Sequence, residues 1–185
     1  MLFYEFVSHL IPSLVYFALI VLFNIGHFRT IDFIFLAVGG FLGTYLIDID
    51  HIIYALITKP DHPSSQEFRK ILSQKKYFQA LIALVRSHLN HTELPFHNAI
   101  FIPIWALFCF FILSSSGSIF ASSLVMAMYL HLLKDIWEVA RREKNFSLNF
   151  LFWQIKSPIS LKIKEYYVYI ITVVFILESL IFLPR

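Results

Sequence analysis

The chain alternates long apolar segments with shorter polar ones. Five apolar segments are about long enough to cross the roughly 30 Å hydrocarbon core of a bilayer as helices. They are predicted at residues 7–26, 31–47, 98–113, 119–139 and 166–183. Strand-like alternation of apolar and polar residues is missing from the sequence. The pattern therefore predicts an all-α integral membrane helical bundle of about five transmembrane helices, which forms one membrane domain over residues 1–185.

The stretch 66–89 has a different pattern, because apolar residues are interspersed there with bases. These bases are Arg69, Lys70, Lys75, Lys76 and Arg86. We predict one or two amphipathic helices on the membrane surface, with the bases facing lipid phosphates. A helical hairpin packed on the bundle is the alternative. Such an insertion could serve as a lid, a lipid anchor or a partner site.

Composition and charge placement support a membrane protein. The chain is 58% hydrophobic and 15% charged. Soluble domains are about 45–50% apolar and about 25% charged. With five spans, the amino terminus and segments 59–97 and 140–164 share one side, which carries most of the 15 Lys and Arg residues. The positive-inside rule makes this side cytoplasmic and the chain a multi-pass protein of the cell (inner) membrane. The single cysteine, Cys109, excludes an internal disulfide and a multi-cysteine zinc site.

Acidic residues and histidines end several apolar segments on the basic side. The set is His9, Asp48, Asp50, His51, His91, His97, His131 and Asp135. His131 and Asp135 are spaced i, i+4 and therefore share a helical face. Asp48 and His51, spaced i, i+3, do the same, so the helix must end or distort near Asp48 if Asp50 is to join them. We predict that these side chains meet at one level of the bundle.

Imidazole and carboxylate together suit a divalent metal ion, with Zn²⁺ first and Mn²⁺ or Fe²⁺ as alternatives. Some members of the set would orient the ligands and not bind the ion themselves. Each piece alone has a simpler interpretation, since a His/Asp pair is often an ion pair and Asp48 and Asp50 could cap the following helix. The coincidence of depth and side favours a metal site of one or two ions. His27 and His62 fall outside it.

Three stretches resemble the YdjM-like family of membrane-bound metal-dependent hydrolases. They are Leu46-Ile47-Asp48-Ile49-Asp50-His51, then His91 with Phe96-His97-Asn98, and Tyr129-Leu130-His131-Leu132-Leu133-Lys134-Asp135. The family motifs are Leu-Pro-Asp-x-Asp-His, His-Arg-Gly-x-x-His-Ser and His-x-x-x-Asp, with an early Gly-His at the place of His9. His88 is an alternative to His91 for the first position of the middle motif. The resemblance implies a metal-dependent hydrolase and does not define its substrate.

We expect a hydrolase at the cytoplasmic face that acts on an anionic small molecule or lipid, most plausibly a phosphoester of a lipid or lipid-linked compound. Asp50 is the predicted general base, and Arg86 and Lys134 are predicted to contact phosphate. Membrane lipid is the expected partner, and nucleic acid is not expected. A non-catalytic, metal-stabilised membrane scaffold is the alternative. An ion transporter ranks last, because the ionisable residues gather at one face of the bundle.

Overall fold

The computed structural model describes residues 2–87, 91–142 and 148–183, and within these ranges it is all-helical, without strands. Four stretches are helical, long and apolar enough to cross a membrane: Phe6–Phe23, Thr30–Thr58, Ile119–Arg141 and Leu161–Phe182. The first, third and fourth belong to α1 (Leu2–Phe23), α7 (Ile119–Arg142) and α8 (Leu161–Phe182). The second contains α2 (Thr30–Leu46), α3 (Ile49–Ile53) and the π-helix η1 (Tyr54–Thr58). These helices indicate a membrane protein.

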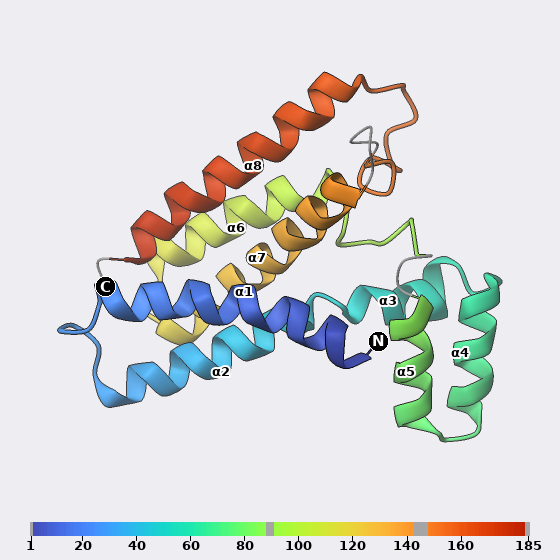
Figure 1. Ribbon diagram of the computed structural model, residues 1–185, viewed down its shortest axis with the longest axis horizontal. Helices are drawn as coiled ribbons and strands as arrows, with labels where there is room; N and C mark the ends of the chain where they lie inside the picture. Colours follow the sequence, from blue (N-terminus) through green and yellow to red (C-terminus); the bar gives the residue numbers. More distant parts are fainter. Residues whose placement is uncertain (1, 88–90, 143–147, 184–185) are drawn as a thin grey trace.

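Helix α7 is central to the bundle and contacts α1, α2, α6 and α8 (Figure 1). Helix α6 (Phe101–Ser115) is apolar but shorter than the four candidate spans. Helices α1 and α2 lie on one side of α7, and α6 and α8 lie on the other. The amino terminus, α3, the start of α6 and the end of α7 gather toward one end of the molecule. The turn after α1 and the turn before α7 lie at the opposite end.

The outward faces of the bundle are apolar. Leu22, Leu107 and Ile170 are 63%, 70% and 61% exposed, and many other large apolar side chains on α1, α2, α6 and α8 are also exposed. The inward faces are closely packed, with Met126, Tyr129 and Leu132 of α7 buried. Apolar faces of this extent are stable when lipid surrounds them, because lipid tails do not impose the hydration cost that water does.

Two glycines allow α2 and α7 to approach each other closely. A Cβ at Gly39 would lie 2.5 Å from the carbonyl oxygen of Phe120, and one at Gly43 would overlap the carbonyl of Leu124. Small residues at these two positions are therefore required for the close packing of α2 on α7. The close approach brings the backbone of Thr44 next to His131 on α7.

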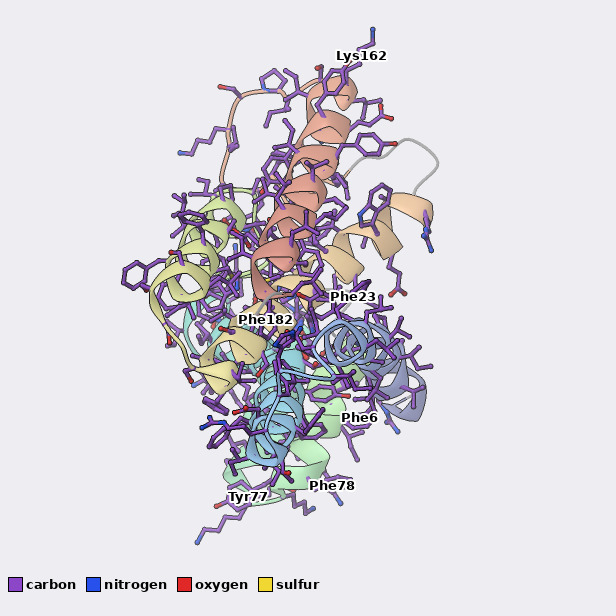
Figure 2. The ribbon with its side chains drawn as sticks, turned by 90° about the vertical axis from the view of Figure 1, so that its left-hand side faces the viewer. Phe6, Phe23, Tyr77, Phe78, Lys162 and Phe182 are labelled. Atoms are coloured by element: carbon purple, nitrogen blue, oxygen red, sulfur yellow. The ribbon has the colours of Figure 1, made fainter. Side chains whose placement is uncertain are left out.

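The insertion forms a hairpin of α4 (Pro63–Ser73) and α5 (Tyr77–Ser87), which stands at the end of the bundle near α3 (Figure 1). Phe68, Ala80 and Leu84 form a small buried core between these helices and the adjoining chain. Tyr77 and Phe78 are 63% and 76% exposed at the hairpin tip, far from Lys162 at the start of α8 (Figure 2). The segment 66–89 therefore contains two helices, and residues 88 and 89 lie outside the described residues.

Some helix ends differ from the predicted ones. Helix α6 begins at Phe101, three residues after the predicted start, and the Asn98 side-chain oxygen accepts hydrogen bonds from the backbone N–H groups of Ile100 and Phe101. Helix α8 begins five residues before the predicted start, because the Ser160 hydroxyl oxygen accepts from the Ile163 N–H as an N-cap. Capping is local and is not visible in a hydropathy pattern.

Candidate metal centre

A break in the second span places the acidic residues of the site. Helix α2 ends at Leu46 and α3 begins at Ile49, so Asp48 lies between two helices and Asp50 in the first turn of the second. Helix α7 presents His131 and Asp135 to the same place, and the segment before α6 presents His97. The predicted interruption near Asp48 is confirmed.

Two imidazoles and two carboxylates converge there. The Nε2 atom of His131 lies 3.3 Å from Asp48 Oδ1 and 3.2 Å from Asp135 Oδ2. The Nε2 atom of His97 lies 3.3 Å from the same Asp135 oxygen. Zinc bonds of about 2.0–2.2 Å place tetrahedral ligand atoms about 3.3–3.6 Å apart. Asp48, His97 and His131 form a set whose ligand atoms all lie within 4.8 Å of one another.

Hydrogen bonds behind the two imidazoles fix how each ring faces this centre. His131 Nδ1–H donates to the Thr44 carbonyl oxygen at 2.6 Å, and His97 Nδ1–H donates to Asp50 Oδ2 at 2.7 Å. In the neutral rings, each Nε2 then carries a lone pair. Among the described residues, both Nε2 atoms are buried without a hydrogen-bond partner. In the neutral rings these lone pairs face carboxylate oxygens 3.2–3.3 Å away, an arrangement that fits a divalent cation bound by all four groups.

Asp50 lies behind His97. It is fully buried, and its Oδ2 accepts from the Phe96 backbone N–H as well as from His97. It does not belong to the lining of the pocket described below. This is the position of a carboxylate that orients a metal-binding histidine.

His9 and Lys134 flank Asp135 on its other side. His9 Nε2 lies 2.9 Å from Asp135 Oδ1, and its ring stacks on His131 with centroids 4.2 Å apart. His9, His131 and Asp135 form a second candidate ligand set that overlaps the first. Lys134 Nζ lies 3.1 Å from His9 Nε2 and 2.5 Å from a carboxylate oxygen of Glu138. Lys134 therefore lies at the site, but its ammonium group is paired with the carboxylates of Asp135 and Glu138.

His51 and His91 pair with each other, through Nδ1 atoms 2.9 Å apart. His51 Nε2 lies 4.0 Å from Asp48 Oδ1, while His91 lies farther from the centre, against Tyr54. His88, the alternative to His91, lies outside the described residues. Arg86 is exposed on α5 and is not part of the pocket lining.

A pocket of about 350 Å³ adjoins the centre. Asp48, Asp135, His9 and His51 supply its polar lining. Most of its wall is apolar: Phe6, Tyr45, Leu46, Ile49, Ile52, Leu81, Leu84 and Val85. Three of these residues belong to α5, so the hairpin forms one side of the pocket. The sequence predicted Arg86 of the insertion as a substrate contact, but no pattern indicated that apolar residues of α5 would line the pocket.

The charges around His97 favour its protonated form when no cation is bound. Burial lowers the pKa of His97, but the carboxylates of Asp50 and Asp135 outweigh burial and raise it to about 10. A cation that binds Nε2 therefore competes with a proton.

Comparison of the chain with known protein families, with curated proteins and with solved structures finds no match. Function is therefore inferred from the geometry of the site.

Proposed function

We propose that this protein is a membrane-embedded, metal-dependent hydrolase. The observation that carries the proposal is the pair of buried Nε2 atoms of His97 and His131 beside a pocket. They lie 3.2–3.3 Å from carboxylate oxygens of Asp48 and Asp135 and have no hydrogen-bond partner among the described residues. These four residues are the proposed ligands of a divalent ion, Zn²⁺ first, and His9 is an additional candidate. The order of Asp48, Asp50, His97, His131 and Asp135 along the chain agrees with the resemblance to YdjM-like hydrolases.

A divalent ion in this position supplies Lewis acidity and lowers the pKa of water. The residues around it have separate tasks. Asp50 and the Thr44 carbonyl hold His97 and His131 in one tautomer and one orientation. Asp48, whose side chain is 40% exposed toward the pocket, is placed to accept a proton from water, a role that the sequence assigned to Asp50.

The pocket walls suggest the class of substrate. A largely apolar wall favours a hydrocarbon chain, and a cationic centre at one end favours an anionic head group. A phosphoester of a lipid or lipid-linked compound combines both features. Lys134 is the base nearest the centre and Arg86 lies on the outer surface of α5, and both stay predicted phosphate contacts.

The membrane arrangement is part of the proposal. Helix α6 would be the fifth span, although shorter than the others, and the basic end of the bundle would face the cytoplasm. The α4–α5 hairpin would then lie at the interface, with Tyr77 and Phe78 at the level of lipid head groups.

The test is the metal content of the detergent-purified protein, measured by elemental mass spectrometry. We expect near-stoichiometric Zn²⁺, Mn²⁺ or Fe²⁺ in the parent and none in an Asp48→Ala/His131→Ala variant that retains its helical circular dichroism. Asp61→Ala/His27→Ala, which alters exposed residues outside the site, is the matched control. Parent protein that stays metal-free after incubation with Zn²⁺ and Mn²⁺ would refute the metal centre. Lipid phosphoesters are then screened with the loaded protein.

The second candidate is a structural metal clamp without catalysis. It would share the metal content but leave every ester intact and would lose thermal stability when the ion is removed. The pocket beside the centre favours the hydrolase, because a purely structural ion does not require one.

A further inference from the structure

A row of hydrogen-bonding side chains leads from the pocket to the base of the hairpin. His51 Nδ1 lies 2.9 Å from His91 Nδ1. His91 Nε2 lies 3.0 Å from the Ser64 hydroxyl, which lies 2.7 Å from His62 Nδ1. Each of these distances is that of a good hydrogen bond. The four residues belong to α3, the segment before α6, and the start of α4, so tertiary structure brings these three segments together.

The row has one end at the site and one end at the protein surface. His51 lines the pocket, with its Nε2 atom 4.0 Å from Asp48 Oδ1. His91 in the middle is 3% exposed, and Tyr54 stacks on its ring with centroids 4.3 Å apart. His62 at the far end is partly exposed. His91 in the middle of the row is thus shielded, while His51, Ser64 and His62 are partly exposed.

Every member can both donate and accept a hydrogen bond. The Ser87 hydroxyl, 3.4 Å from His91 Nε2, is a weaker branch because it donates to the Ala83 carbonyl. Two complementary arrangements of protons satisfy the row, one with every N–H or O–H directed outward and one with every donor directed inward. Passage of a proton from one end to the other converts one arrangement into the other.

We propose that His51, His91, Ser64 and His62 form a proton relay between the pocket and the surface. The proposal rests on the proposed hydrolase function and adds to it a path for the protons of the reaction. The sequence predicted His51 and His91 as metal ligands and set His62 aside, whereas the relay gives all three a common role.

Ester hydrolysis uses the relay once in each direction. When water attacks phosphorus, an O–P bond forms and one water proton passes to Asp48 and from there to His51 Nε2, 4.0 Å away. The outward arrangement then delivers a different proton from His62 to solvent. When the bond from phosphorus to the leaving oxygen breaks, the inward arrangement returns a proton from His62 to His51 and then to the leaving alkoxide. The products are an alcohol and a phosphate, no net proton is consumed, and the original arrangement is restored.

Ser64 is the best residue to perturb, because among the described residues its hydroxyl hydrogen-bonds to His62 and His91, and it is not one of the proposed ligands. Ser64→Ala removes the link, and Ser64→Thr keeps a hydroxyl. Ser65→Ala is the matched control, since Ser65 is the next residue, is fully buried, and its hydroxyl has no hydrogen-bond partner among the described residues.

The first readout is independent of catalysis. In ¹⁵N-histidine NMR spectra of the metal-loaded protein, Ser64→Ala should shift the ring nitrogens of His51, two links away, because the arrangement of donors changes along the whole row. Ser64→Thr and Ser65→Ala should leave the His51 signals in place. Unchanged His51 signals in Ser64→Ala would overturn the relay, whether or not the protein hydrolyses esters.

The second readout is turnover of two phosphoesters, one with an alkyl leaving group and one with a nitrophenyl group that departs as an anion. Ser64→Ala should lower kcat for the alkyl ester tenfold or more, within the roughly 10²–10⁴-fold range of general acid–base catalysis. It should affect the nitrophenyl ester less, with metal content unchanged and activity restored in Ser64→Thr. Equal losses on both esters would contradict proton delivery. If His51 responds but the loaded parent hydrolyses neither ester, the hydrolase proposal fails and the hydrogen-bonded path stands.

Discussion

The buried carboxylate of Asp50 allows a direct test of how the candidate metal centre is held. In Asp50→Asn, the amide oxygen can occupy the position of Oδ2 and still accept from His97 Nδ1–H and the Phe96 N–H. The negative charge is lost, so His97 becomes a weaker electron donor to a bound cation. The amide nitrogen occupies the position of Oδ1, which is buried and has no hydrogen-bond partner among the described residues.

The expected effect is on metal affinity. Loss of a carboxylate that supports a metal-binding histidine weakens binding by about 10–100-fold, or about 1.4–2.7 kcal/mol of binding free energy. The unpaired amide N–H₂ adds a folding cost of about 1–3 kcal/mol, which lowers the melting temperature of the metal-free protein by a few degrees.

Competition titration with a fluorescent zinc chelator measures the affinity, and circular dichroism measures the melting temperature. Asp61→Asn, at an exposed loop position, is the control and should match the parent in both. The same titration separates two roles for Asp50. An orienting carboxylate changes the dissociation constant, whereas a general base changes kcat alone. A dissociation constant within twofold of the parent, together with a kcat reduced a hundredfold, would refute the orienting role and restore the general base that the sequence predicts.

Two further predictions concern packing and pH. Gly43→Ala should destabilise the protein by about 1–3 kcal/mol and weaken metal binding. The reason is that the new Cβ overlaps the Leu124 carbonyl and moves α2 away from His131. Gly26→Ala, where a Cβ would meet nothing within 4 Å, is the control and should match the parent in melting temperature and in metal titration. Because the carboxylates around His97 outweigh burial and raise its pKa to about 10, His97 carries a proton below that pH and metal binding must release it. The apparent dissociation constant should therefore rise about tenfold for each pH unit lost between pH 8 and 6, and a pH-independent constant over that range, with no proton release to an indicator dye, would contradict the assignment.

Much of the fold is visible in the sequence because the bilayer imposes a simple rule. Apolar runs in the sequence coincide with α1, α2, α7 and α8 and predict these helices. The i, i+4 spacing of His131 and Asp135 places both on one face of α7. The order of apolar segments also brings Asp48 and His97 to the end of the bundle where α7 ends. These features depend on length, polarity and helical periodicity, which a sequence states directly.

The division of labour among the site residues could not be read in the same way. Whether Asp50 binds a cation or supports His97 depends on which direction its side chain takes after the helix break at Asp48. The partner of His131 Nδ1 is a backbone carbonyl, which any residue at position 44 would supply. Ser64 lies 27 positions from His91, and no local spacing joins them. Such contacts arise from tertiary packing and have no signature in hydropathy.

The location of Asp48 in the break between α2 and α3 has a consequence for ion selectivity. His131 belongs to the most enclosed helix, where packing on several sides fixes its backbone. Asp48 belongs to neither helix, and its side chain is 40% exposed. The proposed coordination sphere therefore combines a His131 nitrogen on a constrained backbone with an Asp48 oxygen whose side chain is free to rotate. An ion of larger radius is accommodated by rotation of one carboxylate, so the identity of the bound metal would follow its availability in the cell more than the shape of the protein.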